Sequence, residues 1–215
     1  MEVFRNLWWK LRPQGGVSLS EAMKMTETNL TPSMNLFIND VRQVVRVGGG
    51  EQVVTKEIAA RLRSLLQEGD VLDPRYTRPK LDKPVGYPIW VEPDGSFCVA
   101  AVVWNVGQVT PVHDHGTWGV IGIYQGVEHE VTYKPAIVTG ARLYKQTGER
   151  DITEREVIVC CTSDRDIHRV SCGSNVPCVG IHVYGADIGT IERHVYDPQT
   201  GDVRPFVSGW TSVEE

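Results

Sequence analysis

The segment GQVTPVHDHGTWGVIGIYQG, from Gly107 to Gly126, carries the clearest signal in the chain. It holds two histidines, His113 and His115, separated by one residue. Residues i and i+2 of a β-strand point to the same face, so this spacing predicts two imidazoles that can bind one metal ion. Asp114, between them, is expected to face the other way. The apolar run that follows, closed by Gly126, predicts a buried strand rather than a surface loop.

A third histidine, His168, lies in DRDIHRV, 53 positions after His115 and at the start of a predicted strand. In a small barrel, one strand commonly supplies two ligands and a strand across the barrel the third. Three imidazoles suit iron, copper, zinc or nickel and leave coordination positions open for substrate. Because neutral imidazoles bring no charge to the ion, such a site is expected to favour an anionic ligand, including a thiolate.

The composition is that of an ordinary globular protein. The chain has 215 residues, of which 41% are hydrophobic and 23% charged, and a net charge of −5. These values give no reason to expect nucleic-acid binding, and no apolar run reaches the length of a membrane helix. The odd number of cysteines, with no secretory signal, predicts a reducing, cytoplasmic location. We expect all five to be small buried residues: Cys98, Cys160, Cys161, Cys172 and Cys178.

The first third of the chain has helical periodicity. Ser33 is predicted to cap a helix with apolar positions from Leu36 to Val45, ended by the glycines at 48–50. A second helix is predicted from Thr55 to Gln67. Before these helices, apolar residues between positions 4 and 11 share one helical face. They predict a short helix docked on the body, in preference to a membrane anchor.

The rest of the chain is predicted to be mostly β. Residues 71–93 form a proline-rich, irregular connection, and turn-bounded strands follow from Ser96. The predicted fold is a jelly-roll β-barrel with N-terminal helices, in which residues 1–70 are a helical region packed on a barrel of residues 71–215. Strands are predicted at 98–106, 119–133 (two, turned at 125–126), 141–145, 156–161, 168–172 and 177–184, with a hairpin at 193–206.

These residues resemble a known family. GQVTPVHDH with Gly126 resembles the first cupin motif, although Gly119 or Val120 stands where cupins usually have glutamate. With IHRV at 167–170, IHVYGADIG at 181–189 and PFVSGW at 205–210, the chain resembles the thiol dioxygenases, the cysteine and 3-mercaptopropionate dioxygenases, over roughly residues 76–210. The resemblance implies mononuclear non-haem Fe(II), O₂ as co-substrate and oxidation of a small thiol to its sulfinate. Nickel or zinc is an expected substitute in a crystal.

The resemblance also assigns roles to individual residues. It gives the iron ligands as His113, His115 and His168. His182 and Tyr184 match the histidine and tyrosine of the family's outer-shell Ser-His-Tyr relay, whereas Gly180 replaces the serine. We expect a water or a backbone group to stand in for that hydroxyl. Gly119 replaces the cysteine that some members crosslink to the tyrosine, so no thioether crosslink on Tyr184 is expected.

The substrate carboxylate has two candidate anchors. Arg78 resembles the arginine of cysteine-type enzymes, and Arg193 lies where mercaptopropionate-type enzymes have one. A guanidinium matches a carboxylate through two parallel bonds. Trp118 is assigned either to the pocket wall or to the core, and the remaining histidines, His129 and His194, to the surface.

Two other functions fit the same three histidines. One is a different cupin dioxygenase, for example one that cleaves diketones, although the His182–Tyr184 pair argues against it. The other is a non-catalytic small-molecule sensor. The expected partners are a small thiol and O₂, with neither nucleic acid nor membrane. The sequence leaves open the thiol, the oligomeric state and the role of the first 30 residues.

Overall fold

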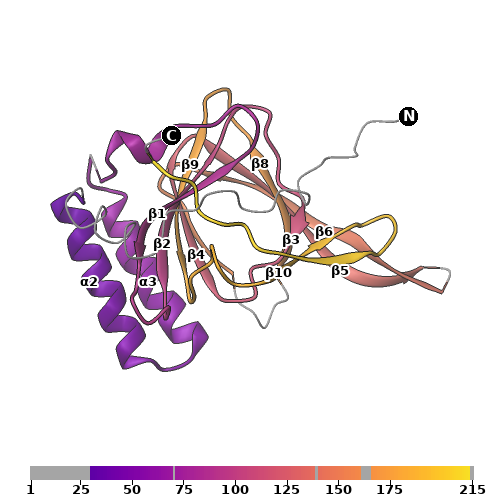
Figure 1. The fold of residues 1–215 in the computed structure, drawn as a ribbon, viewed down its shortest axis with the longest axis horizontal. Helices are drawn as coiled ribbons and strands as arrows, with labels where there is room; N and C mark the ends of the chain where they lie inside the picture. The colour runs from indigo at the N-terminus through magenta and orange to yellow at the C-terminus, as the bar shows by residue number, and fades with distance from the viewer. Residues whose placement is uncertain (1–29, 70, 139, 161–165, 214–215) are drawn as a thin grey trace.

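Two antiparallel β-sheets face each other, and a pair of helices covers the outside of one of them (Figure 1). The computed structural model describes residues 30–69, 71–138, 140–160 and 166–213. The five-stranded sheet has the order β1 (Val85–Val91), β2 (Cys98–Trp104), β9 (Cys178–Tyr184), β4 (Gly119–Gln125) and β7 (Val157–Cys160). The six-stranded sheet has the order β11 (Val203–Phe206), β10 (Arg193–Tyr196), β3 (Val112–His113), β8 (Ile167–Cys172), β5 (Val127–Val138) and β6 (Ala141–Thr153).

This arrangement confirms the predicted fold class, a mostly β jelly-roll barrel with helices on its N-terminal side. The chain crosses between the two sheets at most of its connections, from β2 through β5 and from β6 through β10. Gly126, with φ of 76°, makes such a passage from β4 to β5. A side chain there is disfavoured because L-residues rarely adopt positive φ.

The N-cap of helix α2 (Pro32–Val47) lies two residues before the predicted cap. Thr31 is the N-cap, and its hydroxyl accepts a hydrogen bond of 3.2 Å from the Met34 amide. The assignment of Ser33 as the cap was wrong, because Pro32 can occupy the first helical position and leaves Ser33 inside the helix. Gly48, with φ of 70°, ends the helix as predicted.

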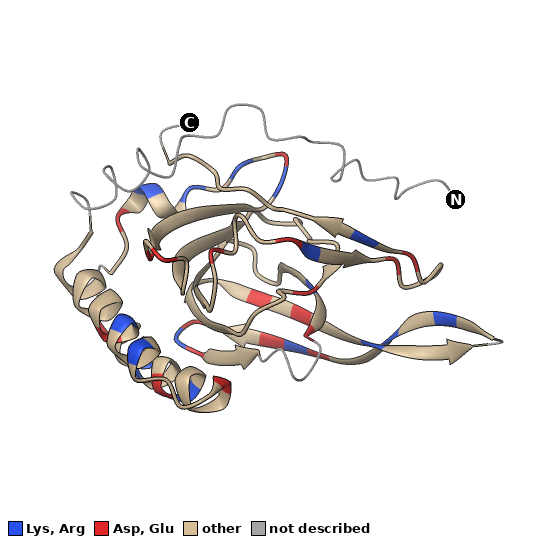
Figure 2. Ribbon diagram, turned by 60° about the horizontal axis from the view of Figure 1, so that its bottom comes forward, with Lys and Arg blue, Asp and Glu red and all other residues tan. Residues whose placement is uncertain are grey.

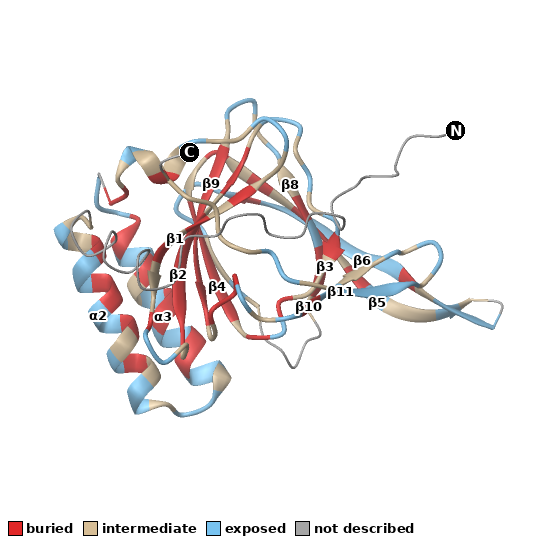
Figure 3. Cartoon of the chain, in the orientation of Figure 1, coloured by how far each residue is buried: buried red, intermediate tan, exposed pale blue. Residues whose placement is uncertain are grey.

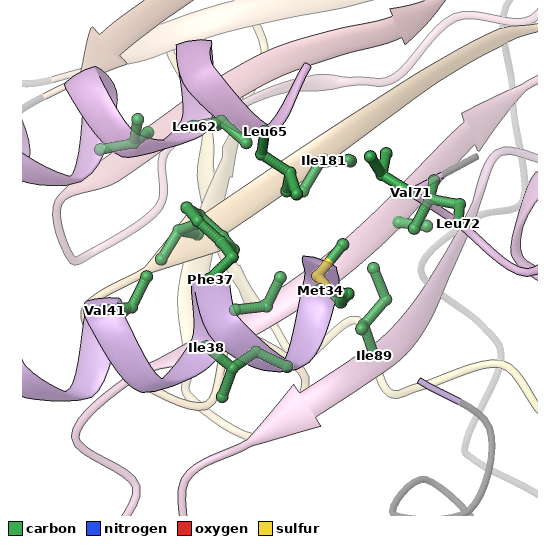
Figure 4. Packing of buried hydrophobic residues seen from close by; sticks show 14 of the residues in the cluster. Met34, Phe37, Ile38, Val41, Leu62, Leu65, Val71, Leu72, Ile89 and Ile181 are labelled. Carbon is green, nitrogen blue, oxygen red and sulfur yellow. The ribbon is translucent and has the colours of Figure 1, made fainter. Parts of the chain in front are cut away.

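Helix α3 (Glu51–Leu65) begins four residues before the predicted Thr55, directly after the glycines. The two helices bury one continuous face against the five-stranded sheet, as Figure 4 shows for Phe37, Leu62 and Ile181. Leu36, which the periodicity placed on that face, is 69% exposed. The predicted helix at positions 4–11 and Cys161 lie outside the described residues.

The region predicted to be an irregular connection contains a strand. After the 3₁₀-helix η2 (Pro74–Thr77), β1 runs from Val85 to Val91 and pairs with β2. Pro88 is tolerated because β1 is an edge strand, and the register shifts between Pro88 and Trp90. Strand β6 likewise runs to Thr153, well past the predicted Lys145, since its exposed polar side chains hide the strand pattern.

Buried residues follow the strands between the sheets and beneath the helices (Figure 3). On β9, alternate residues such as Ile181 pack towards the helices, so His182 and Tyr184 point into the barrel. Basic and acidic residues are interspersed along the helices and the long β5–β6 hairpin (Figure 2). None of the helices in the described ranges has the length and apolar character that a membrane crossing requires.

Candidate metal centre

Three histidines converge inside the barrel. His113 ends β3 and is paired with His168 on the neighbouring strand β8, while His115 follows just beyond β3. The ring centroids are 5.3 Å apart for His113 and His115, 4.7 Å for His113 and His168, and 4.8 Å for His115 and His168. One ring nitrogen from each lies within 4.8 Å of the other two. The structure therefore brings together the three residues that the sequence singled out as metal ligands.

Each imidazole is held from behind through Nδ1. The partners are the Pro111 carbonyl oxygen at 2.9 Å for His113, Asp166 for His115, and Glu130 Oε1 at 2.7 Å for His168. Carbonyl and carboxylate oxygens accept hydrogen bonds, so in each neutral ring Nδ1 carries the hydrogen and Nε2 keeps its lone pair. This is the arrangement in which outer carboxylates and carbonyls orient histidine ligands around a metal.

The protonation of the histidines depends on burial and on these carboxylates. Burial, reinforced by His168 and His115, holds the pKa of His113 well below its usual value. Burial also lowers the pKa of His168, but the hydrogen bond that its Nδ1–H donates to Glu130 and the charge of the nearby Asp166 outweigh this effect, and the net shift is upward. A metal must therefore displace a proton more readily bound at His168 than at His113.

The donor set fits a first-row divalent metal. His168 Nε2 is buried and has no hydrogen-bond partner within the part of the chain that the structure describes. An unpaired buried nitrogen with a free lone pair is costly unless a ligand satisfies it. The expectation that the ion's charge would stay uncompensated needs correction, because Asp166 and Glu130 place two carboxylates directly behind the ligands.

Tyr184 and His182 lie beside the three histidines. The Tyr184 hydroxyl oxygen is 2.8 Å from His182 Nδ1, and the Tyr184 ring centroid is 5.1 Å from that of His115. Both side chains are buried, and burial raises the pKa of Tyr184 well above its usual value. The hydroxyl is therefore a neutral hydrogen-bonding group at the edge of the cluster.

A thiol that the sequence reading missed also lies at this edge. A Cβ added to Gly119 would come 2.7 Å from Cys160 Sγ and 3.0 Å from Tyr184 Cε1. Cys160 on β7 thus fills the space that Gly119 leaves beside Tyr184. The absence of a thioether crosslink stays a prediction, and the approach of Cys160 adds a thiol to consider besides the position of Gly119. Cys98 and Cys178 are buried as expected, whereas Cys160 and Cys172 are partly exposed.

The two candidate arginines differ sharply in position. Arg193 on β10 is 6% exposed, its guanidinium carbon lies 4.5 Å from the centroid of the Phe206 ring, and its positive charge contributes to the lowered pKa of both His113 and His115. Its Nε is buried without a partner among the residues described. Arg78 is exposed after η2, and its backbone carbonyl accepts a hydrogen bond from Tyr87. Only Arg193 therefore joins the histidine cluster electrostatically.

The side chains of the other assigned residues contact the core or the outer surface of the barrel. Trp118 packs against the core beneath the helices, which is the second of its two predicted placements. Asp114 faces outward, as expected, and accepts a hydrogen bond of 2.6 Å from the Tyr196 hydroxyl. His194 is exposed, and His129 is partly exposed and lies 2.7 Å from Asp151.

The sequence analysis missed three carboxylates near the cluster: Glu128 and Glu130, which are buried, and Asp166, which is partly exposed. A usable signal was present for each. Glu128 and Glu130 stand two apart on a strand where they share one face, and Asp166 stands two residues before His168. Because residues two apart on a strand share a face, Glu128 and Glu130 point the same way, and an acidic residue two before a histidine ligand points the same way as that ligand.

No family model matches the chain. It is similar to a solved structure of a Thermus thermophilus protein, at 17% identity over 55% of this chain and 98% of that one, with a TM-score of 0.40. It is also similar to a Klebsiella pneumoniae protein with a double-stranded β-helix domain, at 14% identity over 64% of this chain and 97% of that one, with a TM-score of 0.38. A third similar structure is that of a cupin superfamily protein from Desulfitobacterium hafniense, at 12% identity over 59% of this chain and 88% of that one, with a TM-score of 0.37. The jelly-roll assignment rests on strand order, not on these similarities.

Proposed function

We propose that the protein is a non-haem Fe(II) thiol dioxygenase that oxidises a small thiol carboxylate to its sulfinate. The observation that carries this proposal is the hydrogen-bonded pair of Tyr184 and His182 beside three histidines whose Nε2 atoms are free to bind one metal. A purely structural metal site has no need of a buried phenol at its edge. The same pair disfavours a diketone-cleaving enzyme or a sensor.

His113, His115 and His168 would hold the iron, leaving coordination positions for the substrate thiolate and for O₂. When bound, the iron supplies the redox chemistry by which both atoms of O₂ reach the sulfur. The carboxylates of Asp166 and Glu130 fix the ring orientations and make the imidazoles more basic ligands.

Arg193 is the favoured anchor for the substrate carboxylate. Its buried Nε lacks a partner among the described residues, and a carboxylate would satisfy it through a charge-assisted bond. The two carboxylates nearest the ligands, Asp166 and Glu130, already accept hydrogen bonds from imidazoles and do not offer an obvious partner for a substrate ammonium group. We therefore favour 3-mercaptopropionate over cysteine.

Tyr184 would orient the bound thiol and the reacting oxygen through its hydroxyl group. The phenol is buried and its raised pKa keeps it protonated at neutral pH, so it can donate a hydrogen bond without becoming a charged group in the site. His182 would hold the hydroxyl in place from the side away from the metal.

Oxygen uptake by the Fe(II)-loaded protein tests this function. The panel comprises 3-mercaptopropionate, cysteine, cysteamine, which lacks the carboxylate, and pentane-2,4-dione as a diketone. We expect uptake of one O₂ per thiol and a sulfinate product by mass spectrometry, fastest with 3-mercaptopropionate and weakest with cysteamine. The His168→Ala protein serves as the metal-deficient control. Uptake with the diketone alone, or with none of the four, would exclude a thiol dioxygenase acting on these substrates.

A further inference from the structure

A buried glutamate faces the far side of His182. Glu128 on β5 is 1% exposed, and its Oε2 lies 3.8 Å from His182 Nε2. Neither atom has another hydrogen-bond partner in the described ranges. Burying either polar atom without a hydrogen bond costs free energy. A small side-chain adjustment, or one bridging water, would let the two atoms satisfy each other.

Gly180 makes room for this approach. It is paired with Ile123 of β4 on one side and Val102 of β2 on the other, and a Cβ at this position would lie 2.5 Å from His182 Nε2 and 3.7 Å from Glu128 Oε2. A side chain at 180 would push the imidazole away from the carboxyl group. The glycine therefore lets a carboxyl group from the opposite sheet reach the histidine, in place of the water or backbone group that the sequence led us to expect.

We infer that Glu128 is a positioning residue that fixes the tautomer of His182 and thereby the direction in which the Tyr184 hydroxyl points. This inference builds on the proposed function, because it assigns the hydroxyl a task at the metal. Glu128 Oε2 makes no hydrogen bond to a ring nitrogen of the three metal-ligating histidines in the described ranges. It acts through His182.

The coupling follows from the chemistry of a neutral imidazole, in which one nitrogen donates and the other accepts. If Glu128 donates to Nε2, then Nδ1–H donates to the Tyr184 oxygen, and the phenolic hydrogen is free to point towards the cluster. If Glu128 accepts from Nε2–H, the Tyr184 hydroxyl must donate to Nδ1. Without a partner at Nε2, both arrangements are accessible and the hydroxyl has no fixed direction.

The surroundings keep both partners in a state that can hydrogen-bond. Burial holds the pKa of His182 well below its usual value, so the ring is neutral. Burial also raises the pKa of Glu128 to about 7, with His168 opposing and Glu130 adding to the shift. Below that pH the carboxyl group is protonated and can donate to Nε2, which favours the arrangement in which Nδ1–H donates to the Tyr184 oxygen, without forming a permanent buried charge.

The ring nitrogens of His182 report the tautomer directly. We would record long-range ¹H–¹⁵N spectra of the metal-free protein about one pH unit below the pKa of Glu128, where its carboxyl group is protonated, assigned with a His182→Gln variant, for wild type, Glu128→Gln and Glu128→Leu. We expect one neutral tautomer in wild type and in Glu128→Gln, whose amide still hydrogen-bonds, and a mixture in Glu128→Leu, which keeps the bulk and removes the polar atoms. The signals of the partly exposed His129 show that each variant is folded.

Steady-state kinetics supply the second measurement. In the Fe(II)-loaded protein, we expect Glu128→Leu to lower kcat about tenfold or more with little change in KM or iron content, and Glu128→Gln to retain most of the wild-type kcat. Glu149→Gln, an exposed carboxyl-to-amide change on the adjoining strand β6, is the matched control and should behave as wild type.

The outcomes separate the two proposals. Identical His182 spectra in wild type and Glu128→Leu would overturn the role of Glu128, whatever the activity. A tautomer mixture in Glu128→Leu, in a protein that consumes no O₂ with any thiol, would uphold the positioning role and reject the proposed function. Equal loss of kcat in Glu128→Gln and Glu128→Leu would show that charge, not hydrogen-bonded positioning, is what His182 needs.

Discussion

Single residues around the three histidines determine what the site can bind. Each ligand ring has an oxygen behind it, and two of the three oxygens belong to carboxylates. These contacts select the Nδ1–H form, which turns Nε2 towards the metal position. The neutral imidazoles carry no negative charge, but the carboxylates that are hydrogen-bonded to two of them do.

This arrangement makes a prediction about metal affinity. Asp166→Asn and Glu130→Gln should each weaken binding of zinc, used as a redox-inert probe, by about 10- to 100-fold, since an amide orients the ring less firmly and supplies no charge. Competition with a chelating dye measures the affinity, and Glu149→Gln controls for loss of a carboxylate elsewhere. Unchanged affinity in both variants would mean that the carboxylates serve the fold rather than the metal.

The two arginines give a second prediction at this scale. Arg193→Met, which keeps much of the bulk against Phe206, should raise KM for 3-mercaptopropionate about 10- to 150-fold, which corresponds to the roughly 1.5–3 kcal/mol of a hydrogen bond to a charged group. Arg78→Met should leave KM unchanged, because its side chain is exposed. The reverse pattern would transfer the anchor to Arg78 and reopen the case for cysteine.

At the scale of elements, the helices depend on one close approach to the sheet. A Cβ at Gly122 of β4 would lie 2.7 Å from Leu66 Cδ1 and 2.9 Å from Leu62 Cδ2. Gly122→Ala should therefore cost about 1–3 kcal/mol of unfolding free energy, the usual penalty of overpacking. Urea denaturation measures it, and Gly95→Ala, at a turn with open space but positive φ, gives the cost of backbone strain for comparison. A Gly122→Ala protein as stable as wild type would show that α3 moves away freely.

Sequence patterns predicted elements whose side chains alternate or repeat clearly. The buried strand β4, the histidine pair and both helices followed from periodicity. Strand β1 was missed because its proline and those around it indicated a loop. The length of β6 was underestimated because most of its side chains on both faces are exposed and polar, so they do not alternate with apolar ones. The predicted start of α2 was displaced because Thr31 and Ser33 are both suitable cap residues.

Long-range pairing was beyond the sequence. Arg193 reaches the cluster only because β10 pairs with β3, and nothing local to either strand specifies that partner. The same holds for Glu128, which meets His182 across the gap between the two sheets, and for Cys160, which β7 carries beside Tyr184. Residue types and spacings could identify the ligands, whereas their supporting groups required the three-dimensional arrangement.

For the whole molecule, the barrel encloses carboxyl groups whose ionisation must influence its stability. Glu128 has a pKa of about 7 in the folded protein, against a usual value of 4.5, because of burial. A group whose pKa is raised by folding stabilises the fold fully below its unfolded pKa, and this contribution is lost as the pH rises through the folded pKa. Relative to a variant without this carboxyl group, the metal-free wild type should therefore become less stable from about pH 4.5 to about pH 7.

The difference of about 2.5 pH units corresponds to a loss of roughly 3 kcal/mol, at 1.36 kcal/mol for each unit. Urea denaturation of the metal-free wild type and of Glu128→Gln at pH 5, 6, 7 and 8 measures it, and the difference between the two should widen with pH and then level off above pH 7. Glu149→Gln, compared with wild type in the same way, controls for removal of an exposed carboxyl group. A difference that stays constant across this range would mean that the folded barrel admits enough water to ionise Glu128 without penalty, and the enclosure of the His182 side of the site would have to be abandoned.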